Sequence, residues 1–170
     1  FTGNTAIFIP ALYQKKISLK LVLKNWSLSY VGNFIGSIFV AYFLVFETHL
    51  FSQSPWLEAC VKIAESKVNQ EFYVLLLKAI GCNWLVCLAV WLANSSTDIM
   101  GKIIGIWFPI MAFVAIGFEH SVANMFFIPL GILYGAKVTW TTFLLANLLP
   151  VTIGNIIGGT FFVGIIYSYL

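Results

Sequence analysis

Two ionisable residues, Glu119 and His120, are neighbours in the otherwise apolar stretch GFEHSVANMFFIP, residues 117–129. An imidazole can give or accept a proton near neutral pH, and a carboxylate can accept several hydrogen bonds. Asn124 follows His120 by four residues, so the two side chains share one helical face and can point into a common channel. Phe113, seven residues before His120, would add a bulky apolar constriction to that channel. This spacing predicts a site that handles a proton or a small anion.

The composition places these residues in a membrane protein. Of the 170 residues, 61% are hydrophobic and 9% are charged, whereas soluble domains carry about 25% charged residues. The positive charge comes from scattered lysines without any arginine, which argues against a nucleic-acid partner. The cysteines are interpreted as small packed residues and not as a metal site or disulfide, with Cys60 in a loop, and Cys82 and Cys87 about 140° apart around a helix.

Each candidate also has a structural interpretation. A single histidine among apolar residues is often only a packed, hydrogen-bonded side chain. The carboxylate of Glu119 would, in the structural alternative, satisfy unpaired backbone amides where a helix is interrupted. We favour function for His120, because ionisable groups inside a membrane are costly and usually lie on a transport pathway. For Glu119 we favour the structural role.

Further polar residues lie within or beside the apolar segments. Asn83 lies in the middle of AIGCNWLVCLAV, where an unpaired amide is costly, so we expect it to bond backbone groups of a broken helix. Asn33 and Asn155 invite the same interpretation. Lys67 and Lys78 lie near the start of a span, where a lysine most often only extends its ammonium group to the membrane surface.

Runs of about 20 apolar residues predict the membrane spans. Full spans are predicted at 25–46, 72–94 and 143–170. Pro150 tilts or kinks the last of them near its start. Segments 103–117 and 122–134 are each too short to cross alone, and together they form one broken span.

The placement of lysines predicts the orientation. Four lysines precede the first full span and mark that side as cytoplasmic: Lys15, Lys16, Lys20 and Lys24. The connection 47–71 is then an external loop, and the C-terminus returns to the cytoplasmic side. We expect a multi-pass protein of the plasma membrane, which would be the inner membrane in a bacterium.

The chain also contains an internal repeat. FIPALYQKK at 8–16 resembles FIPLGILYGAK at 127–137, and the spans that follow share the pattern N-x6-G-N-x2-G. The pattern aligns Asn25, Gly32, Asn33 and Gly36 with Asn147, Gly154, Asn155 and Gly158, the glycines being interpreted mainly as close-packing positions. An odd number of crossings separates the copies, so they run in opposite directions, as in transporters that bind substrate at interrupted helices. From this symmetry we expect the chain to be a fragment that lacks the first helix and the first half of the second.

These motifs in combination resemble the formate/nitrite transporter family. The resemblance rests on FTGNT, AESKVNQEF, GCNWLVCLAVW, GFEHSVANMFFIP and LLPVTIGNIIGG, which span essentially the whole chain in the family's order. It implies an all-α integral membrane, aquaporin-like fold with an inverted repeat and discontinuous helices, in which residues 1–170 are one transmembrane transporter domain. It also implies a homopentamer in the lipid bilayer, with one pore in each protomer for small monovalent anions that pass with a proton.

The resemblance further implies roles for individual residues. The implied pathway residues are Thr2, Lys67, Phe113 and His120, and the implied pore-supporting residues are Asn83 and Asn155. The spacing argument above adds Asn124 to the pathway, and its place at the helix break adds Glu119 to the pore-supporting residues. Thr2 would face the central histidine, and Lys67 would line the outer vestibule and not merely reach the surface. The two asparagines would brace the helix breaks.

Physical chemistry favours passage coupled to a proton. Moving a bare carboxylate-sized ion into an apolar constriction has an idealised cost of order 20 kcal/mol, whereas protonating an acid of pKa about 4 at pH 7 costs about 4 kcal/mol. His120 then either supplies the proton or, if burial keeps it neutral, only donates a hydrogen bond while water supplies the proton. We expect transport of formate, nitrite or a similar anion, with hydrosulfide, acetate and lactate as alternatives.

Other classes of protein fit the sequence less well. A neutral-solute channel of the aquaporin type would carry paired Asn-Pro-Ala motifs, and the sequence has none. A membrane enzyme with Glu119 and His120 as acid and base would need a nucleophile, metal or cofactor motif, and neither HExxH nor a nucleophile elbow occurs. A purely structural subunit would not need a polar centre. We therefore expect a transporter that needs no cofactor, and not an enzyme.

Overall fold

The computed structural model describes residues 1–169, and over that range every regular element is a helix. The first part contains α1 (Asn4–Ile7), α2 (Ile9–Tyr13), α3 (Leu19–Phe39) and its π-helical extension η1 (Val40–Phe46). The middle part contains α4 (Trp56–Val68), α5 (Phe72–Ser95), α6 (Ile99–Ile116) and α7 (Ser121–Leu133). The last part contains α8 (Trp140–Thr142), the π-helix η2 (Phe143–Leu148), α9 (Leu149–Gly159), the π-helix η3 (Thr160–Ile165) and the 3-10 turn η4 (Ile166–Ser168).

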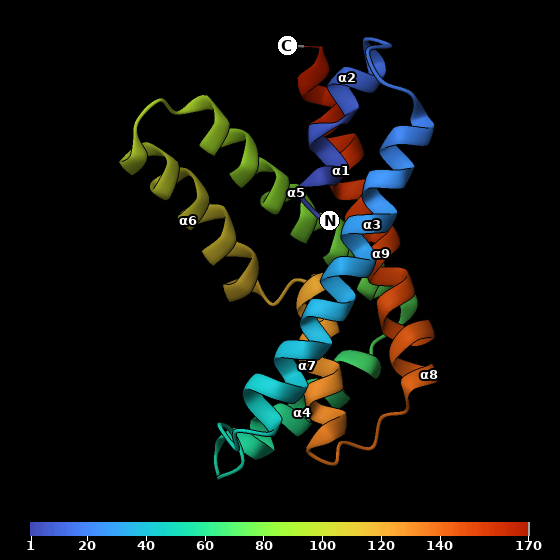
Figure 1. Cartoon of the computed structure of the whole chain (residues 1–170), viewed down its shortest axis with the longest axis vertical. Helices are drawn as coiled ribbons and strands as arrows, with labels where there is room; N and C mark the ends of the chain where they lie inside the picture. Colours follow the sequence, from blue (N-terminus) through green and yellow to red (C-terminus); the bar gives the residue numbers. More distant parts are fainter. Residues whose placement is uncertain (170) are drawn as a thin grey trace.

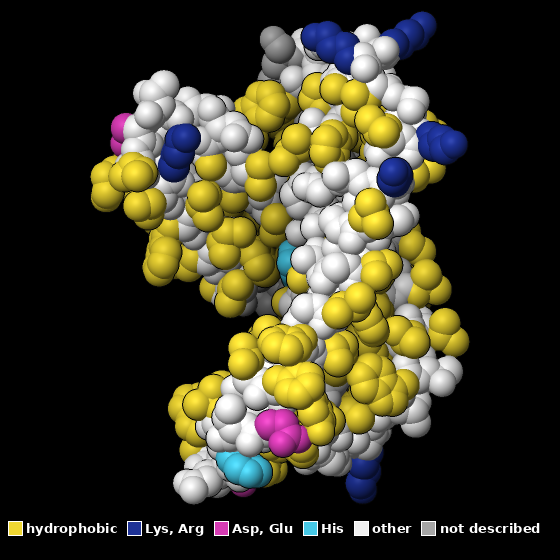
Figure 2. Space-filling model, viewed as in Figure 1, with side chains coloured by type: hydrophobic (Ala, Val, Ile, Leu, Met, Phe, Trp, Pro, Cys, Tyr) yellow, Lys and Arg dark blue, Asp and Glu magenta, His cyan; other side chains and the backbone are white. Residues whose placement is uncertain are grey.

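Four continuous helical segments are long and apolar enough to cross a bilayer. They are Leu19–Phe46, Phe72–Ser95, Ile99–Ile116 and Trp140–Ser168, with 28, 24, 18 and 29 residues. Leu170, the last residue of the predicted span 143–170, lies outside the described residues. Apolar side chains cover much of the visible surface, as expected where helices face lipid (Figure 2).

The starts of the helices follow from side-chain caps. The Ser18 hydroxyl accepts a hydrogen bond from the amide of Leu21, and the Asp98 carboxylate accepts one from the amide of Gly101 at 2.8 Å. The Gly101 amide lowers the pKa of the Asp98 carboxyl group, because it stabilises the charged form. These caps explain why α3 begins six residues before the predicted span and α6 four residues before the predicted segment.

The break between α6 and α7 lies beside the middle of α5. Gly117 ends α6 with a left-handed φ of 76°, and α7 begins at Ser121. A side chain at Gly81, midway along α5, would overlap the Phe118 ring in this break. Figure 1 shows α5 and α6 as an antiparallel hairpin, with α7 continuing from the end of α6 toward α4. The discontinuity therefore lies where the sequence predicts it, but the prediction that its first half is too short to cross is wrong on length, because α6 has 18 residues.

The glycines of the two repeat copies have different surroundings. Gly154 and Gly158 let α9 approach α5 closely, since a Cβ at Gly154 would lie 2.6 Å from the carbonyl oxygen of Leu76, and one at Gly158 would overlap the carbonyl oxygen of Ile80. In contrast, a Cβ at Gly32 or Gly36 would meet nothing within 4 Å among residues 1–169. The predicted close packing is thus present on α9 and absent on α3 in this part of the protein.

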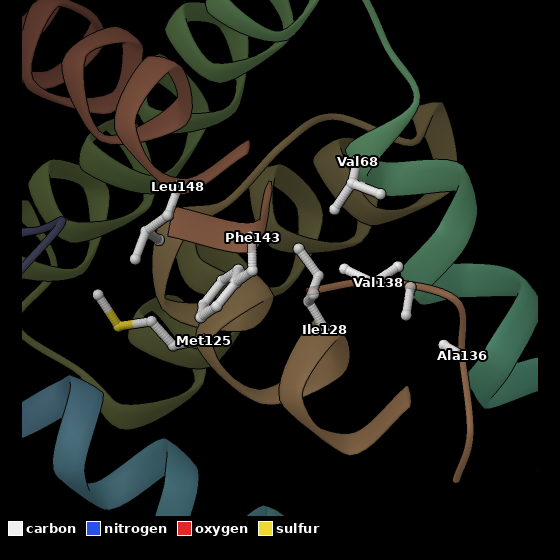
Figure 3. Packing of buried hydrophobic residues seen from close by; sticks show 8 residues of the cluster. Val68, Met125, Ile128, Ala136, Val138, Phe143 and Leu148 are labelled. Atoms are coloured by element: carbon white, nitrogen blue, oxygen red, sulfur yellow. The ribbon is translucent and has the colours of Figure 1, made fainter. Parts of the chain in front are cut away.

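The connection 47–71, predicted as a loop between two spans, contains helix α4. Its 13 residues place Cys60, which we expected in a loop, on a helix. Its apolar face packs on α7, where Gly131 leaves no room for a side chain beside Ala64. Figure 3 shows the side chains of the core between α4, α7 and η2 directed toward one another; the core residues are Ala64, Val68, Met125, Ile128, Ala136, Val138, Phe143 and Leu148. This core fixes α4, and with it Lys67, against the second half of the broken pair.

Candidate functional site

The centre of the site is a contact between Thr2 and His120. The Thr2 hydroxyl oxygen lies 3.1 Å from His120 Nε2, and the two residues come from opposite ends of the chain, just before α1 and just before α7. The Phe113 ring stacks on the imidazole with 5.7 Å between ring centroids. Three of the residues predicted for the pathway therefore meet at the end of α6 and the start of α7.

The helix cap on α7 determines the tautomer of His120. The amide of Ala123 donates a hydrogen bond to His120 Nδ1 at 3.1 Å, and this bond caps the helix. An amide N–H can only donate, so Nδ1 must carry a lone pair. A neutral imidazole then has its proton on Nε2, the nitrogen that faces Thr2. The backbone thus holds His120 as a hydrogen-bond donor directed at the centre of the protein.

Two cavities are connected to this contact through their lining residues. One of about 380 Å³ is lined by Lys67, Phe113, Val114, Gly117, Phe118, His120, Ala123, Asn124 and Phe127. A second, of about 140 Å³, is lined by Ala6, Ile7, Pro10, Cys87, Val90, Trp91, Asn94, Val163 and Gly164. Cys87, which lines the second cavity, donates a hydrogen bond to the carbonyl oxygen of Thr2. The hydroxyl group of the same Thr2 contacts His120, which lines the first cavity. Thr2 therefore bonds to one lining residue of each of these two mainly apolar cavities.

An ion pair lies in the larger cavity. Lys67 Nζ is 3.0 and 3.1 Å from the two carboxylate oxygens of Glu119, whose side chain is only 3% exposed. The same carboxylate accepts hydrogen bonds from Asn124 Nδ2 at 2.6 Å and from Gln70 Nε2 at 3.2 Å. Asn124 therefore lines the cavity but directs its amide at Glu119. This arrangement corrects the expectation that the Glu119 carboxylate satisfies backbone amides at the break, because all of these donors are side chains.

Lys78 also differs from its predicted role. The sequence predicts that its ammonium group extends outward to the membrane surface. In the structure Lys78 is half-buried, and its Nζ donates to Gln70 Oε1 at 2.6 Å. Gln70 was not singled out by the sequence, and it connects this lysine to Glu119.

Two buried asparagines hold the segments around the break. Asn83 Nδ2 donates to the carbonyl oxygens of Thr2 and Asn155 and to the Thr5 hydroxyl, at 3.2, 2.5 and 2.9 Å. Asn155 Oδ1 accepts from the Ser121 amide at 2.9 Å. Its Nδ2 donates to the carbonyl oxygens of Ala79 and Glu119, at 2.9 and 3.1 Å. The partners are largely backbone groups at or near the interrupted segments, which is the kind of partner the sequence predicts.

Matching hydrogen bonds occur in the two repeat copies. Asn4 Nδ2 donates to Asn25 Oδ1 at 2.8 Å, and Asn124 Nδ2 donates to Asn147 Oδ1 at the same distance. The backbone nitrogen of Phe1 donates to Asn33 Oδ1, as the Ser121 amide does to Asn155 Oδ1, both at 2.9 Å. Sequence reasoning missed Asn147 as a site residue, although its alignment with Asn25 was the signal that could have found it.

The sequence and the fold both match one family of known proteins. The family model described as formate/nitrite transporter matches residues 1–169. The chain belongs to this family. A "Probable formate transporter" from Methanothermobacter thermautotrophicus is 48% identical over 187 residues, covering 99% of this chain and 66% of the relative. A formate channel from Bacillus thuringiensis is 51% identical over 168 residues, covering 98% of this chain and 63% of the relative.

Solved structures of the family have the same fold. An "FNT family ion channel" superimposes with a TM-score of 0.89 at 32% identity, covering 99% of this chain and 67% of that one. A "Pentameric formate channel with formate bound" gives 0.82 at 33% identity, covering 91% and 68%. The predictions of an all-α fold, of a multi-pass integral membrane protein and of the formate/nitrite transporter family are thereby confirmed. The chain spans slightly less than two thirds of the length of the curated relatives described above.

Proposed function

We propose that the whole protein conducts small monovalent anions of weak acids, such as formate or nitrite, through a pore in each protomer of a homopentamer. The names of the relatives, a formate transporter and a formate channel, support the substrate class. The solved pentameric formate channel with formate bound supports both the substrate and the assembly. The exposed lysines beside α2 and at the start of α3 lie at one end of the molecule (Figure 2), which supports a cytoplasmic location for that end in a plasma membrane. The C-terminus lies at the same end (Figure 1) and is therefore proposed to be cytoplasmic too.

The observation that carries the proposal is the Thr2–His120 contact at a helix break, where His120 lines one cavity and Thr2 bonds to Cys87 of another. The larger cavity has an ammonium group among its lining residues, which attracts an anion, and a phenylalanine stacked on the imidazole. Beyond this point an anion has apolar surroundings, in which its charge is costly. The anion is therefore protonated near the contact and crosses it as a small neutral acid.

His120 acts in this scheme as a hydrogen-bond donor, and water supplies the proton. Its Nε2–H faces Thr2 and can be offered to an arriving carboxylate oxygen. A charged imidazolium would need a proton on Nδ1, which would displace the Ala123 amide and remove the cap of α7. The backbone thus favours the neutral form of the imidazole and disfavours its use as the acid.

We further infer that the two repeat copies are related as an inverted repeat. The paired bonds Asn4–Asn25 and Asn124–Asn147 support this relation, because each joins an asparagine in the first turn of a half-helix to the asparagine that opens the shared pattern N-x6-G-N-x2-G. The paired bonds to Asn33 and Asn155 support it a second time. In such a repeat both interrupted helices direct their ends at one central site.

Replacing Lys67 by methionine should raise the half-saturating formate concentration of proteoliposomes about tenfold, because the entry cavity loses a positive charge. The ammonium group has three N–H donors, of which two are directed at Glu119, and one is left for an anion. The measurement is the initial rate of labelled formate uptake by the wild-type and variant transporters. Saturable wild-type uptake, absent from protein-free vesicles, is the result expected of the proposed function.

Lys62→Met is the matched control, because Lys62 is exposed on the same helix. The double variant Lys67→Met/Glu119→Gln removes the buried carboxylate that the single variant leaves without its cation, and so separates capture of the anion from folding. An unchanged half-saturating concentration in Lys67→Met would return this lysine to a purely structural role.

A further inference from the structure

We propose that Lys78 is a second cation of the anion-entry site and that it acts through Gln70 and Glu119. This inference rests on the proposed function and adds to it a residue that the sequence assigns to the membrane surface. The chain of contacts is continuous: Lys78 Nζ lies 2.6 Å from Gln70 Oε1, and Gln70 Nε2 lies 3.2 Å from Glu119 Oε1.

The chemistry of the three groups fixes the direction of this chain. An ammonium group can only donate, so it must face the carbonyl oxygen of the Gln70 amide. The amide nitrogen then faces Glu119, which as a carboxylate only accepts. Lys78 therefore determines which end of Gln70 meets the carboxylate, and each bond polarises the next in the same sense.

The position of Lys78 on α5 independently directs it at the same place. Gly81 lies one turn later on the helix, and a Cβ there would lie 2.6 Å from the Phe118 ring. Residues three apart share a helical face, so Lys78 lies on the face of α5 that packs on the break. Phe118 itself lines the larger cavity, and it immediately precedes Glu119.

The balance of charge explains why a second cation is needed. The pair formed by Lys67 and Glu119 is neutral as a whole, so by itself it attracts an anion only weakly. With Lys78 the connected network has two ammonium groups and one carboxylate, and its net charge is positive. Glu71 and Glu65 also lie near this end of the protein, but no hydrogen bond or ion pair joins either of them to the network within residues 1–169.

The test compares Lys78→Met and Lys78→Gln with wild-type protein and with Lys62→Met as a control at an exposed lysine. Formate uptake is measured in proteoliposomes at low and at high ionic strength with the full-length transporter. Both neutral variants should raise the half-saturating concentration roughly five- to tenfold at low ionic strength, and much less at high ionic strength, where the charge is screened. Lys78→Arg, which keeps the charge, should stay within about twofold of the wild type.

A merely structural lysine would give a different result. Its loss would lower the maximal rate or the yield of assembled protein without changing how the half-saturating concentration depends on salt. The inference would be overturned if the neutral variants matched Lys62→Met in the half-saturating concentration and in its dependence on ionic strength. The proposed function would then remain intact. A wild-type transporter without saturable formate uptake would instead overturn the proposed function, and the inference with it.

Discussion

Formate uptake by proteoliposomes should fall about 100-fold when His120 is replaced by phenylalanine, because a hydrogen bond to a charged group contributes up to about 3 kcal/mol. Phenylalanine fills the space of the imidazole and can still stack on Phe113, which lies 5.7 Å from the imidazole ring centroid to centroid. It lacks the Nε2–H that faces Thr2. The initial rate of labelled formate uptake, normalised to assembled protein, is the measurement.

Two further variants separate transport from folding. Phenylalanine removes the cap of α7, which costs about 1 kcal/mol, whereas His120→Asn retains a side-chain oxygen that can accept the Ala123 amide. We expect the asparagine variant to melt like the wild type and still to transport poorly, because its shorter side chain does not reach Thr2. His49→Phe, at an exposed residue after η1, should leave uptake unchanged. Wild-type uptake by an assembled His120→Phe protein would remove His120 from the mechanism.

Replacing Asn155 by leucine should lower the free energy of unfolding by about 3 kcal/mol or more, because buried partners lose their hydrogen bonds. Asn155 is fully buried and bonds three backbone groups, those of Ser121, Ala79 and Glu119. Leucine has nearly the same size and cannot form any of these bonds. In detergent the midpoint of thermal unfolding should fall by about 10 °C.

Asn69→Leu is the matched control for this variant. Asn69 is exposed at the end of α4, so the same chemical change removes no buried hydrogen bond there. We expect its melting temperature to stay close to that of the wild type. If Asn155→Leu had the same melting temperature as Asn69→Leu, Asn155 would not hold the break together. Our explanation of how α5, α7 and α9 are joined would then be wrong.

The position of the break between α6 and α7 is predictable from the sequence for local physical reasons. Gly117 can adopt the left-handed conformation that ends α6, and the ionisable pair that follows cannot be accommodated in an apolar span without polar partners. The contact of His120 with Thr2 is not local, since 118 positions separate the residues. It came from the family resemblance, and the roles of these residues in transport stay predictions.

The errors of the sequence interpretation also have physical causes. Helix α4 is too short to cross a membrane and carries four charged residues, so a search for apolar spans misses it. Its packing on α7 depends on the close approach of Gly131 to Ala64, which only the three-dimensional structure shows. The ion pair of Lys67 with Glu119 joins residues 52 positions apart, and no pattern within either segment predicts it. Lys78 was misassigned for a different reason: its partner Gln70 lies in the short connection between α4 and α5, so the helical pattern of α5 does not predict the contact.

The central claim is that the travelling anion loses its charge to a proton at the Thr2–His120 contact. It is tested most directly by comparing the uptake of formate with that of perchlorate, the anion of a strong acid, in wild-type proteoliposomes over a range of external pH. Formate uptake should rise as the external pH falls and should raise the external pH as it proceeds, while perchlorate should be excluded at every pH. Perchlorate uptake as fast as that of formate, without a response to pH, would contradict the account.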